Sequence, residues 1–159
     1  MFTLQDISRK FLQKQDTMQE YLHKAQEKCM EIPDNLVGFE PEDHEYAIEV
    51  TKEELGLDDE LINTLLEDYV TQILKNIPQF RAMVKKLKKS FSEEKLTELR
   101  DLAHKNLGVA RNLRIKDAQK ILQRVMREDD LERIELFLDY LEACAIKLKP
   151  ETAYKMYTK

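Results

Sequence analysis

The sequence is poor in the residues that interrupt helices. Its 159 residues include only three glycines and four prolines, and there is no tryptophan. Glycine and proline are the residues that most disfavour the interior of a helix. A chain with so few of them, and with abundant Lys, Glu and Leu, is expected to be all-α. At this length we expect one domain with a single core, with room for an appendage.

Cysteine and histidine are too few and too scattered to build a site that their spacing would reveal. Cys29 and Cys144 belong to no CxxC pair, and His23, His44 and His104 have no metal-ligand spacing. We therefore predict no metal and no cofactor, and interpret both cysteines as small buried hydrophobic residues in a reducing compartment. A Gly-rich phosphate loop is also absent from the sequence, so we expect no ATP site.

Long apolar runs are missing as well. No stretch approaches the ~20 apolar residues of a membrane span, and charges interrupt the N-terminal residues where a signal sequence would have its apolar core. The net charge of −5 is unlike that of a general nucleic-acid binder, which is normally basic. We expect a soluble, cytoplasmic protein that binds neither membrane nor nucleic acid.

What the sequence does contain is a series of amphipathic helices. Apolar residues recur at three- and four-residue spacing, and four such stripes with short connections follow residue 58. Short connections make neighbouring helices antiparallel, so residues 51–149 are predicted to form an up-down four-helix bundle. Pro78 lies inside the first of these helices and is expected to kink or divide it. Residues 150–159 are expected to form a C-terminal tail or short helix.

The first 50 residues lie outside this bundle. An apolar stripe from Leu4 to Cys29 predicts an extra long helix over about 3–30, which either docks on the core or forms a homodimer. We interpret residues 32–50, which are rich in Glu and Asp, as an acidic linker along the surface. Thr51 and Glu54 then have the spacing of a capping box that opens the bundle.

The segment with the clearest chemical potential is the helix predicted over about 93–113. His104 lies at the border of its apolar stripe, where a side chain is anchored and still reachable from solvent. Gly108 follows one turn later. A glycine inside a helix costs roughly 1 kcal/mol relative to alanine, so we interpret this one as clearing the approach to the imidazole. Arg100, Lys105 and Arg111 place cations around the ring.

Residues about 51–148 resemble the histidine-containing phosphotransfer (HPt) domain of bacterial phosphorelays. Members of that family carry a segment of the type His-x-Leu-Lys-Gly, followed by small residues and a Leu-Gly corner. The matching positions are His104, Gly108, Ala110, Asn112 and Leu113. The sequence departs from the pattern at the Leu-Lys pair, which is Asn106-Leu107 here, and at the corner glycine, which is Arg114.

The resemblance implies that His104 accepts a phosphoryl group from the aspartate of a response-regulator receiver domain, or returns it. A hybrid sensor histidine kinase would be a further partner. The chain would carry the phosphoryl group without being an enzyme. Lys105, Arg111 or Arg100 would replace the missing lysine in supporting the charge, while Gly108 and Leu107 would give the partner access.

A second interpretation involves no phosphorylation. The chain would then be a degenerate HPt-like bundle that acts as a protein-interaction or dimerisation module. The two interpretations differ in what they expect of His104. An exposed imidazole beside an open surface over Gly108 favours the carrier, whereas a buried imidazole bonded to core groups favours the module.

Overall fold

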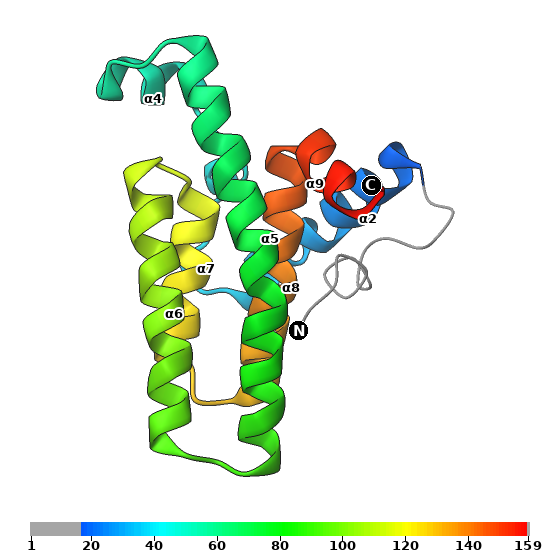
Figure 1. The fold of residues 1–159 in the computed structure, drawn as a ribbon, viewed down its shortest axis with the longest axis vertical. Helices are drawn as coiled ribbons and strands as arrows, with labels where there is room; N and C mark the ends of the chain where they lie inside the picture. The colour runs from blue at the N-terminus through cyan, green and yellow to red at the C-terminus, as the bar shows by residue number, and fades with distance from the viewer. Residues whose placement is uncertain (1–16, 159) are drawn as a thin grey trace.

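The structure, a computed structural model, describes residues 17–158. Its elements are α2 (Met18–Met30), α3 (Ile32–Asn35), the 3-10 helix η1 (Pro41–His44), α4 (Ile48–Leu55), α5 (Asp59–Lys89), α6 (Glu93–Asn112), α7 (Lys116–Arg127), α8 (Leu131–Leu148) and α9 (Pro150–Thr158) (Figure 1). No strand occurs within residues 17–158, which confirms the predicted all-α class.

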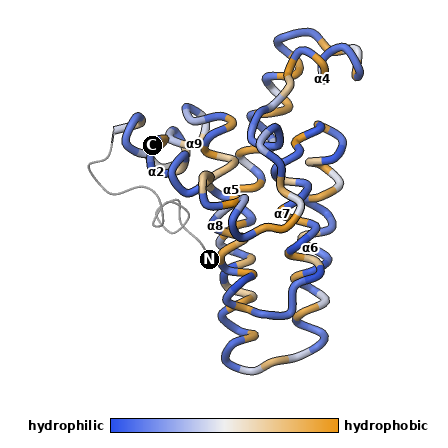
Figure 2. The backbone as a smooth tube through the Cα atoms, turned by 180° about the vertical axis from the view of Figure 1, so that it is seen from behind, coloured by the Kyte–Doolittle hydropathy of each residue, from blue (hydrophilic) through white to orange (hydrophobic). Residues whose placement is uncertain are grey.

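Helices α5 to α8 surround the main core. α5 packs on α6 and α8, and α7 packs on the same two helices, so the four contact one another in a ring (Figure 1). Each contributes fully buried side chains, among them Ile73, Leu99, Ile121 and Leu141. Figure 2 shows hydrophobic and hydrophilic positions interleaved along these helices. The ring of contacts fits the predicted four-helix bundle, while the up-down order of the helices stays a prediction.

Polar side chains start the long helices. The Asp58 carboxylate accepts a hydrogen bond from the Leu61 amide (2.8 Å) at the start of α5. Ser92 caps α6 and Asp130 caps α8 in the same way. α5 then runs as a single helix through Pro78, so of the two effects expected of this proline, division of the helix is excluded. Pro78 is itself buried, like its neighbours Ile77 and Phe80.

The N-terminal helix is shorter at its start than predicted and docks on the core. Thr17 has extended backbone and shares a reciprocal capping box with Glu20, so α2 begins at Met18. The predicted helix over 3–30 is therefore interrupted at Thr17, and its part over 3–16 lies outside the described residues. α2 packs on α8 and α9, with Tyr21 and Ala25 fully buried. The sequence leaves open whether the apolar face of this helix docks on the core or forms a homodimer. In the described part, this face docks on the core.

Residues 32–50 are not the irregular acidic linker that was predicted. They contain α3, η1 and the first residues of α4. The predicted capping box at Thr51 is also wrong, because the Thr51 hydroxyl lies inside α4 and donates to the Ala47 carbonyl (3.0 Å). α4 starts at Ile48 and ends at Gly56, whose φ of 66° lies in the left-handed region that favours glycine.

A buried ionic cluster joins α5 to α8. Nη2 of Arg81 donates to Asp139 Oδ1 (2.9 Å) and to Glu142 Oε1 (2.6 Å). Glu142 is fully buried and Asp139 is nearly so. Because a buried charge that loses its partner is strongly destabilising, this cluster fixes how the two helices face each other.

Candidate functional site

His104 lies in the fourth turn of α6 with its side chain exposed to solvent. Ala103 and Leu107 on either side of it are buried in the core, so the backbone beneath the imidazole is firmly held. The ring makes no hydrogen bond and no ion pair with any residue in the range 17–158. Both ring nitrogens are therefore available to a reagent or partner that approaches from solvent.

The surface over Gly108 is open. A Cβ atom added at this position would meet no atom of the described chain within 4 Å, apart from its own helix backbone and neighbours. Gly108 also has no positive φ, so its backbone conformation does not demand glycine. Neither packing nor geometry within the fold therefore requires a glycine here. What it supplies is free space one turn from the imidazole.

The three cations predicted to surround His104 are in different situations. Arg100 is engaged elsewhere, because its Nη2 donates to Asp129 Oδ1 (2.8 Å) and to the Glu128 carbonyl (3.4 Å). Lys105 and Arg111 are exposed and form no ion pair within the described part of the chain. Arg111 is two turns beyond His104 on the same side of α6, and helical side chains lean toward the N-terminus. Of the three cations, Arg111 is therefore the best placed to support a charge at His104, which lies on the other side of the open surface over Gly108.

Leu107 does not have the role predicted for it. Its side chain is only 4% exposed and belongs to the hydrophobic core. It cannot form part of a docking surface, because the apolar stripe of α6 draws this position inward. A leucine also brings no charge to the position where the resemblance places a lysine.

Two buried asparagines behind the site were not identified from the sequence. Nδ2 of Asn76 on α5 donates to Oδ1 of Asn106 on α6 (3.1 Å), and Nδ2 of Asn106 donates to the Leu102 carbonyl (2.9 Å). Gln72 extends the chain by donating to Oδ1 of Asn76 (3.3 Å). Both asparagines lie on otherwise apolar faces, which is the signal that could have paired them. The amide chain fixes the register of α5 against α6 behind His104.

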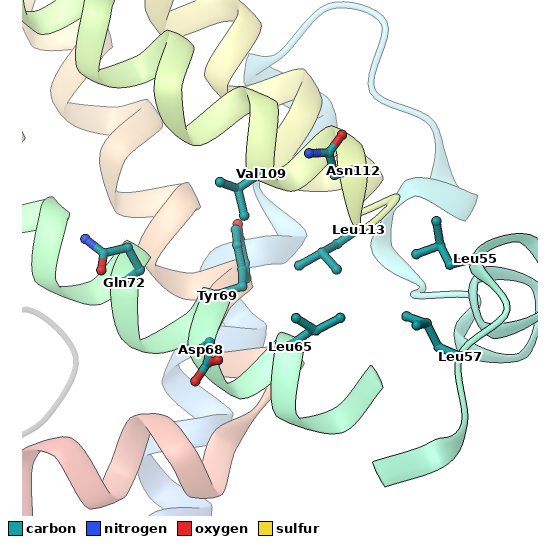
Figure 3. Close-up of a pocket in the computed structure, with 9 residues that line it drawn as sticks. All are labelled: Leu55, Leu57, Leu65, Asp68, Tyr69, Gln72, Val109, Asn112 and Leu113. Carbon is teal, nitrogen blue, oxygen red and sulfur yellow. The ribbon is translucent and has the colours of Figure 1, made fainter. Parts of the chain in front are cut away.

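A groove of about 620 Å³ adjoins the open surface over Gly108. It lies between α4, the first half of α5 and the end of α6 (Figure 3). Its lining residues are Leu55, Leu57, Leu65, Asp68, Tyr69, Gln72, Val109, Asn112 and Leu113. Val109 directly follows Gly108 and is 43% exposed. Burial raises the pKa of the Tyr69 hydroxyl well above its usual value, so this side chain stays neutral.

The described residues show neither a metal centre nor a membrane span. Within residues 17–158 there is no group of three or more His, Cys, Asp or Glu side chains that could hold a metal ion. No helix in the same range is long and apolar enough to cross a bilayer. Comparisons with protein-family models, with curated proteins and with solved structures gave no match, so they assign the chain to no family.

Proposed function

We propose that this chain is a cytoplasmic histidine phosphotransfer protein, in which His104 carries a phosphoryl group to or from the aspartate of a response-regulator receiver domain. One observation carries the proposal. An exposed imidazole without a partner in the described chain lies one turn from a glycine that the fold does not require. A glycine retained at a cost in helix stability, with open space around it, is best explained by something that must approach from outside.

The chemistry follows from the exposed imidazole of His104. A free ring nitrogen attacks the phosphorus of the aspartyl phosphate, the bond from phosphorus to the carboxylate oxygen breaks, and the carboxylate leaves. In the reverse direction the aspartate attacks the phosphohistidine. Such a transfer depends on positioning and on charge neutralisation more than on covalent help from the protein. The receiver would supply the metal and acidic pocket, and Arg111 would face the phosphoryl oxygens.

The groove beside Gly108 gives this partner a place to dock. Its apolar lining contains Leu57 from the connection between α4 and α5, Leu65 from α5 and Val109 from α6. An apolar ridge of the receiver seated there would hold the aspartyl phosphate above α6. A hybrid sensor kinase that carries a receiver domain would use the same contacts.

A second function remains a candidate because of Leu107. With leucine at the position of the family's lysine, the chain lacks one cation near the histidine. The same groove would then serve a module that binds a receiver-like partner without taking its phosphoryl group. The two functions share the docking surface and differ only in the covalent step.

The test is a transfer assay with the full chain. A receiver domain that carries a radiolabelled aspartyl phosphate is mixed with the protein, and the label is followed to a species that is labile in acid and stable in alkali. We expect label on the wild type and on His44→Gln, the matched control, but none on His104→Gln. Binding of receivers without label would establish the module, and absence of label with every receiver from the same cell would overturn the carrier.

A further inference from the structure

The only two cysteines of the chain meet in the structure although they are 115 positions apart. Cys29 lies near the end of α2 and Cys144 lies in α8, and their Sγ atoms are 3.8 Å apart. Both are free thiols and are only 2% and 3% exposed. An oxidant can join two thiols in van der Waals contact into a disulfide. A lone buried cysteine has no second thiol with which to form one.

Charged groups surround the pair on one side. Asp117 at the start of α7 is buried and accepts a hydrogen bond from the Ala118 amide (2.6 Å). Lys147 lies 3.7 Å from the same carboxylate. The contact with Cys144 and the charge of Lys147 lower the pKa of Cys29, whereas the same contact and burial raise the pKa of Cys144. Cys29 is therefore the thiol that ionises first.

We propose that Cys29 and Cys144 form an oxidisable dithiol, which a hydroperoxide converts into a disulfide that fastens α2 to α8. This modification site is independent of the phosphotransfer function proposed for His104. It depends on the packing of α2 against α8.

The reaction balances with a hydroperoxide as the sole oxidant. The Cys29 thiolate attacks the O–O bond, so that Cys29 becomes a sulfenic acid and the peroxide leaves as an alcohol or water after taking up the proton that Cys29 lost. The Cys144 sulfur then attacks Sγ of Cys29. The S–S bond forms, the S–O bond breaks, and the hydroxide released takes the Cys144 proton to become water. Two thiols lose two electrons and one peroxide bond gains them.

The geometry favours a disulfide within one chain over a cross-link between two chains and over further oxidation of one cysteine. A disulfide requires sulfurs about 2 Å apart, so the pair must close by just under 2 Å, which side-chain rotation and a small shift of α2 can supply. Burial of both sulfurs keeps a second protein molecule away. The contact with Cys144 places a resolving thiol beside Cys29, so a sulfenic acid is captured before further peroxide reaches it.

The experiment oxidises the full chain with hydrogen peroxide and measures its mass, its free thiols after denaturation and its unfolding midpoint. We expect a monomer lighter by two hydrogen atoms, with no free thiol. A cross-link that closes so long a loop should raise the midpoint by about 5 to 15 °C, and a reductant should reverse the change.

Cys29→Ser and Cys144→Ser are the matched variants, and each should lose the midpoint shift while peroxide-treated wild type keeps it. Cys29→Ala serves where serine disturbs the buried site. Addition of oxygen atoms to the wild type in place of hydrogen loss, a cross-linked dimer, or two thiols that survive peroxide would each overturn the proposal. If every variant unfolds, the mass and the free-thiol count of the peroxide-treated wild type alone decide whether the disulfide forms.

Discussion

The outer face of α6 and the interface between α2 and α8 are built in opposite ways. On α6, His104 is exposed and has no partner in the described chain, and Gly108 faces open space. At the other interface the side chains are buried, among them Tyr21, Ala25 and Cys29 of α2. Their burial contributes to the free energy of folding, whereas the exposed groups of α6 are free to meet a partner.

The difference teaches where substitutions should act on stability and where they should act on function. Changes near α8 should alter the free energy of unfolding and leave the reactivity of His104 intact. Changes on the outer face of α6 should alter the reactivity of His104 without a cost in stability. The following variants test buried contacts first, and then the surface of α6 and the corner that follows it.

Arg81→Met should have the largest effect on stability. It removes the guanidinium that two buried carboxylates share, which we expect to lower the free energy of unfolding by about 3 kcal/mol. Urea denaturation measures the loss. Lys88→Met is the control, because its ion pair with Glu135 is partly exposed and should contribute much less to stability. Equal losses for the two variants would show that burial of the Arg81 cluster does not matter.

Asn106→Leu should cost about 1 to 3 kcal/mol, because it leaves the buried Nδ2 of Asn76 without its acceptor. Leucine at this position restores the residue type of the HPt pattern. The double variant Asn76→Leu with Asn106→Leu should recover most of the loss, since no unpaired amide remains. Chemical denaturation of the two single variants and the double variant measures the coupling, and additive losses would contradict a direct bond.

Gly108→Leu should raise stability and abolish function. Leucine is a better helix former by up to about 1 kcal/mol, and its side chain meets no obstacle in the described chain. It would, however, fill the space that a receiver needs, so labelling of His104 should fall sharply. Gly108→Ala, the smaller control, should gain similar stability and retain more of the transfer. Undiminished phosphoryl transfer in Gly108→Leu would show that the open surface over Gly108 is not needed for access to His104.

Arg114→Gly should have the smallest effect. Arg114 has a φ of 58°, the left-handed conformation that costs a non-glycine residue about 1 kcal/mol or more. Glycine would relieve this cost but lose the hydrogen bond from Arg114 Nη1 to the Asn112 carbonyl (2.7 Å). We expect a net gain of roughly 0.5 kcal/mol in thermal unfolding. A loss of stability would mean that the hydrogen bond outweighs the backbone strain.

The sequence predicts well what depends on local spacing. Apolar periodicity and polar caps such as Asp58 and Ser92 place the long helices, and the position of His104 at the border of its stripe predicts its exposure. Arg114 also illustrates this, because it has the backbone conformation that would suit the corner glycine of the HPt pattern. These features are encoded within a few residues of one another.

What the sequence does not reveal depends on contacts between distant segments. Nothing near Cys29 indicates that Cys144 lies against it, and nothing near Asn76 names Asn106 as its partner. Both pairs exist only because α2, α5, α6 and α8 pack in one particular way. Leu107 is different, because its burial follows from its place in the apolar stripe of α6.

The packing of α2 against α9 has a consequence for how this unit can be joined to others. The two helices contact each other, with the Tyr21 and Tyr154 rings 5.9 Å apart between centroids (Figure 1). The first and last described helices therefore lie together, beside α8. A reporter or second domain fused after α9 would leave from this side of the molecule. Tandem arrangements of the unit could thus be built with the outer face of α6 unobstructed.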